Sequence, residues 1–194
     1  MYKRQILLYH GFRINEIAQI RLDQITEREN IPIFKISSEY ADQKLKNISS
    51  DRKVPIHPKL IEYGFLKFVE NQCQKGCVRL FQDLFHTKGK GYGQAFSKFF
   101  NKKTFKKEWL SAETLKKIED EVIMLDLHSF RHNFNSSLTG KVEDSVLDEC
   151  MGHESPKGYK YKGGKMEILL KAISECSYDL NISELENKLK KHYS

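Results

Sequence analysis

The sequence predicts a mainly helical α+β domain with a small antiparallel sheet. Several segments carry apolar side chains every three or four residues, which is the period of an amphipathic helix. Two short segments, 31–37 (IPIFKIS) and 52–57 (RKVPIH), are instead rich in β-favouring residues. A polar, lysine-bearing stretch separates them, so we expect them to pair as a hairpin.

Helical periodicity also predicts the elements on the N-terminal side of this hairpin. Residues 6–9 are mostly apolar and no capping residue precedes them, so the chain is expected to begin inside a helix. After Gly11, apolar side chains recur at helical spacing from Ile14 to Ile25. Arg13 is therefore placed near the start of a second helix.

On the C-terminal side of the hairpin, periodicity predicts three further helices. They cover 58–71, 94–107 and 112–123, whereas four glycines make residues 74–93 loop-rich.

The last third of the chain has local signals for helix ends. Asp126 is the expected N-cap of a helix that runs to about Leu138. Gly152 is placed to end the next helix in a left-handed conformation, which puts His153 just past a helix end. Residues 157–164 are rich in Gly, Lys and Tyr and are expected to form a loop before a helix near Met166.

The charge of the chain suits a polyanionic partner. Lysine and arginine number 33 against 26 acids, which gives a net charge of +7 and a pI of about 9.1. This excess does not choose among nucleic acid, acidic lipid and acidic protein. The stretch 98–107 (KFFNKKTFKK) favours DNA, because its lysines alternate with aromatic residues and no acid interrupts them.

Other sequence features argue against membrane, zinc and disulfide chemistry. No apolar run approaches the ~20 residues that cross a bilayer, so we expect no membrane partner and a cytoplasmic location. Cys73 and Cys77 lack the spacing of a zinc knuckle, and no matching His/Cys pair follows. We therefore expect four free thiols and no metal.

Several residues have the chemistry that a phosphoryl transfer requires. Arginine binds two phosphate oxygens through its planar fork, and Arg13 and Arg131 are the candidates. A tyrosine phenol conserves the ester energy in a covalent intermediate, and composition alone does not choose among the nine tyrosines. His128 and His153 are suited to hydrogen-bond the phosphate or to help deprotonate the phenol.

The leaving 5' oxygen needs a proton, and a lysine whose pKa is lowered by neighbouring cations can supply it. Lys44, Lys46 and Lys53 all lie in the predicted hairpin. Their positions alone do not choose among them.

Five segments together resemble the catalytic domain of the tyrosine recombinase, or phage integrase, family, and most closely the prophage-type integrases. The segments, in chain order, are HGFRINEIAQIRLDQI, KNISSDRKVPIHP, LDLHSFRHNF, MGHES and YKYKGGKMEILLKAI. Each is weak evidence alone, but all five occur in the expected order and spacing. The resemblance spans Leu7 to Ile173.

The resemblance implies a role for each candidate residue. Its catalytic set comprises Arg13, Lys46, His128, Arg131, His153 and the nucleophile Tyr161. It also implies that Glu16 braces the first arginine. The step from His153 to Tyr161 is one residue shorter than the family pattern, which keeps Tyr159 as an alternative. Lys46 is preferred over Lys44 by its distance to Val54–Pro55.

The implied function is site-specific DNA recombination that integrates or excises a mobile element. The tyrosine attacks a DNA phosphate, forms a 3'-phosphotyrosyl link and frees a 5' hydroxyl, and this needs no metal or nucleotide cofactor. Double-stranded DNA and further copies of the chain, as a tetramer on DNA, are the expected partners. A bacterial or phage-encoded protein associated with the nucleoid is implied.

Three alternatives are kept. One is a DNA-binding remnant of an integrase without turnover, and another is a related type IB topoisomerase. The third is a metal-dependent nuclease built on His128, His153 and neighbouring acids.

The expected domain organisation is one catalytic domain and a short tail. We expect residues 1–180 to form the catalytic domain, with residues 1–5 (MYKRQ) a sequencing or cloning scar. The family's N-terminal core-binding domain is expected to be absent. Residues 181–194 are predicted to form a helical tail that either docks on a neighbouring subunit or packs on its own domain.

Overall fold

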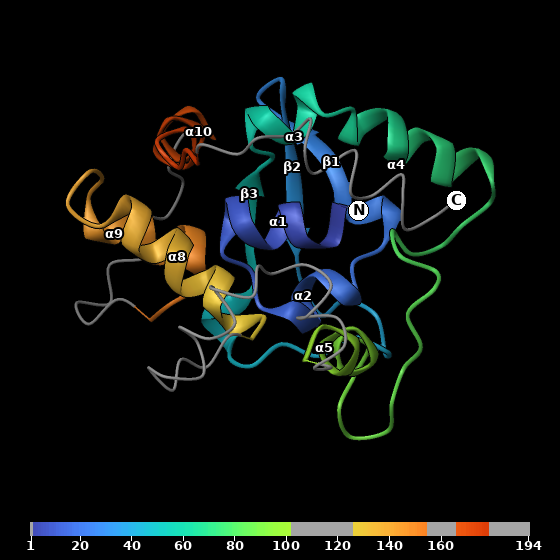
Figure 1. The fold of residues 1–194 in the computed structure, drawn as a ribbon. Coiled ribbons are helices and arrows are strands. Elements are labelled where there is room, and N and C mark those ends of the chain that lie inside the picture. The colour runs from blue at the N-terminus through green and yellow to red at the C-terminus, as the bar shows by residue number, and fades with distance from the viewer. Residues whose placement is uncertain (1, 102–125, 155–165, 179–194) are drawn as a thin grey trace, which may run out of the picture.

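The computed structural model describes residues 2–101, 126–154 and 166–178. They form helices around a three-stranded antiparallel sheet, so the mainly helical α+β class is confirmed (Figure 1). The strands follow the spatial order β1-β2-β3. Their bounds are Ile25–Arg28 for β1, Ile31–Ile36 for β2 and Arg52–Pro55 for β3.

The predicted hairpin is confirmed as the β2–β3 pair. Ile33 pairs with Pro55 and Ile36 pairs with Arg52. The long connection between these strands contains a short 3-10 helix, η2, at Ile48–Ser50.

The expected helical continuation to Ile25 is wrong. Helix α2 covers only Ile14–Ala18, and a 3-10 turn, η1 (Leu22–Gln24), leads into β1. A two-residue turn at Glu29–Asn30 joins β1 to β2, and both residues have positive φ, 55° and 60°. Such turns usually carry glycine, so the absence of glycine at this turn removes the usual sequence signal for a hairpin.

Helix α1 (Tyr2–His10) lies at the centre of the molecule (Figure 1) and buries Ile6, Leu7 and Tyr9 in the main core. It packs against α8 (His128–Leu138). Residues 2–5 belong to α1, and the Tyr2 hydroxyl donates to the Tyr63 carbonyl oxygen at 2.7 Å. The origin of residues 1–5 stays a prediction.

The helix predicted over 58–71 is divided in two. Helix α3 covers Pro58–Glu62 and α4 covers Phe65–Gln74, because Gly64 between them has φ 80°. Helix α5 (Gly93–Asn101) forms the first part of the helix predicted over 94–107. The remainder of that helix, the 112–123 helix and the 181–194 tail lie outside the described residues.

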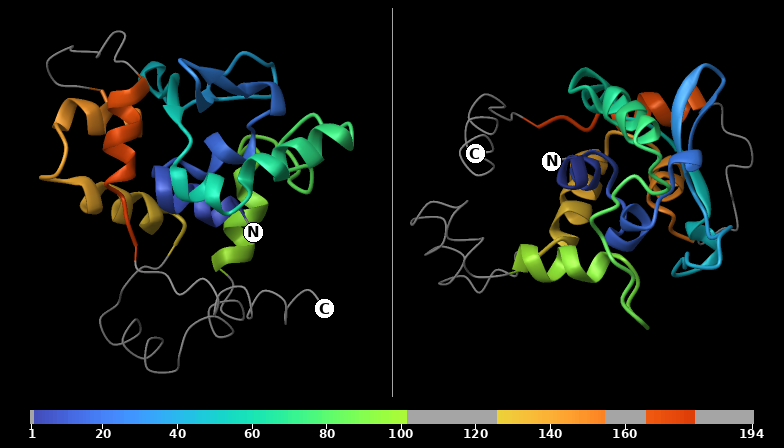
Figure 2. Two further views of the ribbon diagram at one scale, coloured as in Figure 1. Left: turned by 90° about the horizontal axis from the view of Figure 1, so that it is seen from above. Right: turned by 90° about the vertical axis from the view of Figure 1, so that its right-hand side faces the viewer.

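The predictions for the C-terminal third are confirmed where the structure describes it. The N-cap position of α8 is Leu127, one residue after the predicted Asp126. The Asp126 carboxylate nevertheless makes the capping bonds, because it accepts from the backbone N–H groups of His128 and Ser129 at 2.7 and 3.1 Å. Helix α9 (Asp144–Met151) ends at Gly152, whose φ is 65°. Together with α10 (Met166–Ser174), these helices form one side of the molecule (Figures 1 and 2).

Two further sequence expectations concern thiols and membranes. All four cysteines are free, as predicted. Within the described ranges, no helix is both long and apolar enough to cross a bilayer.

Two buried histidines connect α1 to the residues that follow β3. The backbone N–H of His57 donates to His10 Nε2 at 3.0 Å, and His10 Nδ1 lies 3.2 Å from the Ile6 carbonyl oxygen. His57 Nδ1 accepts from the Lys59 N–H, which leaves its Nε2–H to donate to the Cys176 carbonyl oxygen. Burial lowers the pKa of His10 to about 3 and that of His57 to about 4, so both rings are neutral at neutral pH.

We predict that the protein loses stability as the pH falls below about 6.5. The unfolded chain binds protons at His10 and His57 from that pH downward, whereas the folded protein does so only near pH 4 to 3. The free energy of unfolding should fall by about 1.4 kcal/mol per pH unit for each histidine. Urea titrations between pH 7.5 and pH 5 measure this slope.

His10→Gln should flatten that slope, and His132→Gln, at an exposed position on α8, is the matched control. A wild-type slope in the His10→Gln variant would contradict the assignment.

Candidate active site

Arg13 and Glu16 form the first pair of the site, at the start of α2. The Glu16 carboxylate accepts from the Arg13 backbone N–H at 3.0 Å and from Arg13 Nη1 at 2.8 Å. Glu16 is 4% exposed. Burial alone would raise the pKa of Glu16, but the charge and hydrogen bonds of Arg52, with the hydrogen bonds from Arg13, hold it below its usual value.

Arg52 on β3 is the residue that the sequence predictions missed. Its Nη2 lies 3.0 Å from Glu16 Oε2, and its Nε donates to the Cys150 carbonyl oxygen at 2.9 Å. Its Nη1 donates to the Ser50 carbonyl oxygen at 2.7 Å. The alternation of buried and exposed residues along β3 is the sequence signal that could have identified Arg52. Arg52 shares the buried side of the strand with Val54, while Lys53 is exposed.

Arg131 joins the end of α1 to the end of α9. Its Nη1 donates to the Gly11 carbonyl oxygen and its Nη2 to the Met151 carbonyl oxygen, both at 2.7 Å. Burial, followed by the charge of Arg13, lowers the pKa of Arg131 to about 10, which leaves it protonated at neutral pH. Gly11 permits this geometry, because a Cβ there would lie 2.5 Å from the Phe134 ring.

The two candidate histidines lie within the electrostatic field of both arginines. Burial is the largest cause that lowers the pKa of His153, and the charge of Arg131 is the second. Asp148 opposes this shift through a 3.3 Å contact between its Oδ1 and His153 Nδ1. His128 is the first residue of α8. Burial, then His132 and then the two arginines lower the pKa of His128. Both imidazoles are therefore mainly neutral at neutral pH.

The end of α9 packs closely against the Arg52 side chain. A Cβ at Gly152 would lie 2.7 Å from Arg52 Nη1, and the left-handed φ also favours glycine there. The next residue, His153, donates its backbone N–H to the Asp148 carbonyl oxygen at 2.9 Å. The position of His153 thus depends on the same arginine that contacts Glu16.

A hollow of about 540 Å³ brings lysines to Arg13. Its lining includes Glu16 and both Lys44 and Lys46, and the two lysine side chains are exposed. Lys53 is not among the lining residues, and it faces Lys35 across the β2–β3 pair. The structure therefore brings both Lys44 and Lys46 to this hollow and leaves Lys53 outside it.

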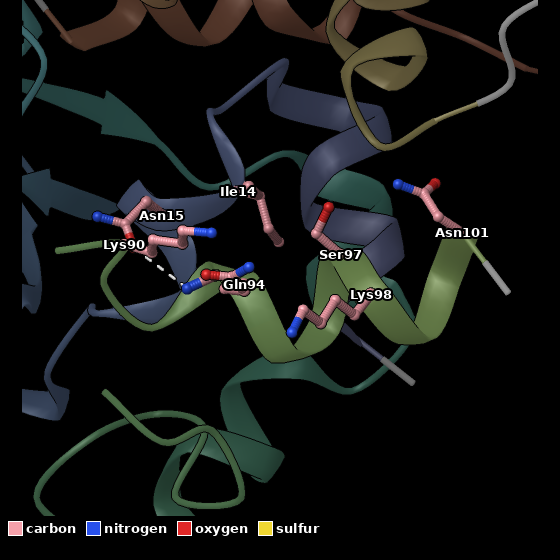
Figure 3. A pocket seen from close by; sticks show the side chains of 8 residues that line it. Ile14, Asn15, Lys90, Gln94, Ser97, Lys98 and Asn101 are labelled. Carbon is pink, nitrogen blue, oxygen red and sulfur yellow. Dashed lines mark hydrogen bonds between the residues drawn. The ribbon is translucent and has the colours of Figure 1, made fainter. Parts of the chain in front are cut away.

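A second hollow, of about 520 Å³, lies between the start of α2 and α5 (Figure 3). Asn15 and Lys90 line both hollows, so the two are contiguous. Figure 3 shows Gln94 and Lys98 on α5 facing this space. The described lining residues are basic, amide, hydroxyl or apolar, with no carboxylate among them.

Within the described residues, the candidate site is therefore a compact cationic cluster. It brings together Arg13, Arg131, His128 and His153, with Lys46 in the adjoining hollow. Tyr161 and its alternative Tyr159 lie outside the described residues, so the nucleophile stays a prediction. The cluster can bind a phosphate through fixed guanidiniums and offers neutral imidazoles for hydrogen bonds or proton transfer.

Comparison with known proteins gives one match. The family model of the phage integrase family matches residues 4–160, and the match ends one residue before Tyr161. No curated protein and no solved structure matches the chain. Because the family match covers well over half of the sequence and includes the arginine cluster, the chain belongs to the phage integrase family of tyrosine recombinases.

Proposed function

We propose that this chain is a site-specific DNA recombinase that cuts and rejoins DNA through a 3'-phosphotyrosyl intermediate. Its role is the integration or excision of a mobile element. The observation that carries the proposal is the placement of Arg131, which donates to the carbonyl oxygens of Gly11 and Met151, two residues before Arg13 and two before His153. His128 precedes Arg131 by three residues on α8. Family membership supports the general class, DNA breaking and rejoining.

The charge of the cluster supports a phosphodiester as the group that is bound. Arg13, Arg52 and Arg131 carry three positive charges, and Glu16 carries one negative charge among them. Two positive charges therefore remain in a mostly buried region. A phosphate brings negative charge to its non-bridging oxygens, where fixed cations stabilise the transition state most strongly.

In the proposed mechanism, the Tyr161 oxygen attacks the phosphorus of one DNA strand. A bond forms between the phenol oxygen and phosphorus, and the bond from phosphorus to the 5' oxygen breaks. Neutral His128 or His153 accepts the phenol proton, directly or through the phosphate oxygens. Lys46, or Lys44 in its place, gives a proton to the leaving 5' oxygen.

The reverse reaction rejoins a strand, so the exchange conserves the ester energy. A 5' hydroxyl from another strand attacks the phosphotyrosyl bond and releases the tyrosine. Exchange between two duplexes requires several active sites, and we propose that copies of the chain assemble as a tetramer on double-stranded DNA.

The direct test is a nicked suicide DNA substrate, which releases a short strand after cleavage and traps the protein on DNA. We expect a covalent adduct that survives a denaturing gel, because the tyrosine is bound to the 3' phosphate. Tyr161→Phe should abolish the adduct, and Tyr159→Phe is the matched control that should retain it.

The outcomes separate the alternatives. An adduct that persists in Tyr161→Phe and is lost in Tyr159→Phe assigns the nucleophile to Tyr159. DNA binding without any adduct identifies a remnant without turnover. Cleavage that a chelator abolishes indicates the metal-dependent nuclease.

The two contiguous hollows give a second prediction, which concerns DNA binding outside the catalytic step. Lys90 and Lys98 line the hollow beside α5, and we propose that they contact phosphates that flank the cleavage point. Each phosphate contact releases counterions, so log K falls with log salt by about 0.9 per contact.

Lys90→Ala and Lys98→Ala should each weaken binding on all DNA sequences and reduce the salt slope by about 1. Lys67→Ala, at an exposed lysine on α4 that lines neither hollow, is the matched control. Salt titrations with a labelled duplex measure the slope, and unchanged slopes in both variants would exclude this contact surface.

A further inference from the structure

Buried amide side chains join α2 to the segment that carries the candidate lysines. Gln19, Gln24 and Gln43 are 2%, 2% and 9% exposed. The Gln43 amide donates to Gln24 Oε1 at 2.8 Å, and the Gln24 amide donates back to Gln43 Oε1 at 3.1 Å. Gln24 also donates to the Ser37 hydroxyl at 2.8 Å. Buried amides persist only where such partners satisfy them, so this network specifies one arrangement.

Gln19 attaches residues 43–50, which we name the lysine loop, to α2. Its side-chain Oε1 accepts from the Lys44 backbone N–H at 3.0 Å and from Asn15 Nδ2 at 3.2 Å. Its backbone carbonyl oxygen accepts from Gln43 Nε2 at 3.1 Å. The start of the lysine loop is therefore held by both the main chain and the side chain of one residue.

The end of the lysine loop is held at the other end of α2. Arg13 Nη1 donates to the Ser50 hydroxyl at 3.1 Å, and that hydroxyl donates in turn to the Asn47 side-chain oxygen. Lys46 lies between the two attachments. Since each residue extends the chain by at most ~3.6 Å, its Cα stays within ~7 Å of the Cα of Lys44.

The contacts of Gln19 lie beside the proposed chemistry without entering it. Gln19, Arg13, Lys44 and Lys46 all line the first hollow, yet the Gln19 oxygen is occupied by two N–H donors. Gln19 carries no proton that the reaction uses. What it determines is where the lysine loop lies relative to Arg13.

We propose that Gln19 is a positioning residue. It holds the lysine loop so that the ammonium group of Lys46 or Lys44 reaches the leaving 5' oxygen. This inference rests on the proposed function, in which Lys46 or Lys44 donates the proton. Loss of the Gln19 oxygen frees the Lys44 N–H from α2, and the general acid then loses its fixed distance to the phosphate bound by Arg13.

A substrate with sulfur in place of the leaving 5' oxygen tests this directly. Cleavage forms the bond from the tyrosine oxygen to phosphorus and sends the electron pair of the breaking bond to sulfur. A thiolate is stable near neutral pH, since thiol pKa values are about 8.5, so it leaves without a proton. The sulfur substrate therefore bypasses the general acid alone.

Gln19→Met should slow adduct formation on the ordinary suicide substrate by about 10-fold or more, because general acids contribute about 10²–10⁴-fold. On the sulfur substrate its rate should return to that of the wild type. The rates of adduct formation are measured at saturating DNA, so that differences in DNA affinity do not affect them. Gln72→Met is the matched control, because that amide donates to the Leu80 carbonyl oxygen from α4, away from both hollows.

Lysine variants keep the two proposals distinguishable. If sulfur rescues Lys46→Ala or Lys44→Ala but not Gln19→Met, the positioning role is overturned while the general acid stands. If sulfur rescues neither the lysine variants nor Gln19→Met, both assignments are overturned.

Gln19→Glu covers the case in which Gln19→Met does not fold. The glutamate keeps an oxygen acceptor for the Lys44 N–H. If Gln19→Glu forms the adduct on the ordinary substrate much faster than the lysine variants do, the proposal is supported. Equal slowing of Gln19→Glu on both substrates overturns it.

Discussion

A single buried carboxylate, that of Glu16, holds the candidate site together. It accepts hydrogen bonds from Arg13 on one side and from Arg52 on the other, so α2 and β3 meet at one side chain. Burying these charges is costly, and the cost is offset only because they are paired and hydrogen-bonded. Arg52 extends the interaction to the Cys150 carbonyl oxygen of α9, and Arg131 reaches the same helix end through Met151. Helices α2, α8 and α9 and strand β3, which are distant in sequence, are thereby held around one group of positive charges.

This arrangement explains why the cluster suits a ligand of negative charge. Glu16 neutralises only one of the guanidiniums, and the lowered pKa of Arg131 follows from burial and from the remaining positive charge nearby. Burial, with the charges of the arginines added to it, lowers the pKa of both His128 and His153 and keeps them mainly neutral, which suits hydrogen bonding and proton transfer better than a fixed positive charge. A bound phosphate diester would relieve the repulsion, so in the proposed function the affinity for DNA and the positioning of the phosphate have the same physical origin.

The parts of the fold that the sequence predicts are those with strong local signals. The β2–β3 pair follows from two β-rich runs, the Asp126 cap from its position ahead of a helix, and the end of α9 from Gly152. Strand β1 was missed, because its turn uses two left-handed residues without glycine. The alternation along β3 indicates that Arg52 is buried. Its partners, like those of Gln19, come from distant segments, so no local pattern reveals what either side chain contacts. The family resemblance identified Arg13, Arg131 and both histidines, which the fold brings together.

The most direct test of this account is a double-mutant cycle on the free energy of unfolding with Glu16→Gln and Arg52→Met. Glu16→Gln leaves the Arg52 charge buried without its carboxylate and should cost about 3–5 kcal/mol. Arg52→Met leaves Glu16 paired with Arg13 alone and should cost less. The double variant should lose less than the sum of the two by at least about 1 kcal/mol, because it removes both charges of the pair. Costs that add within about 0.5 kcal/mol would contradict the central role of the Glu16–Arg52 interaction.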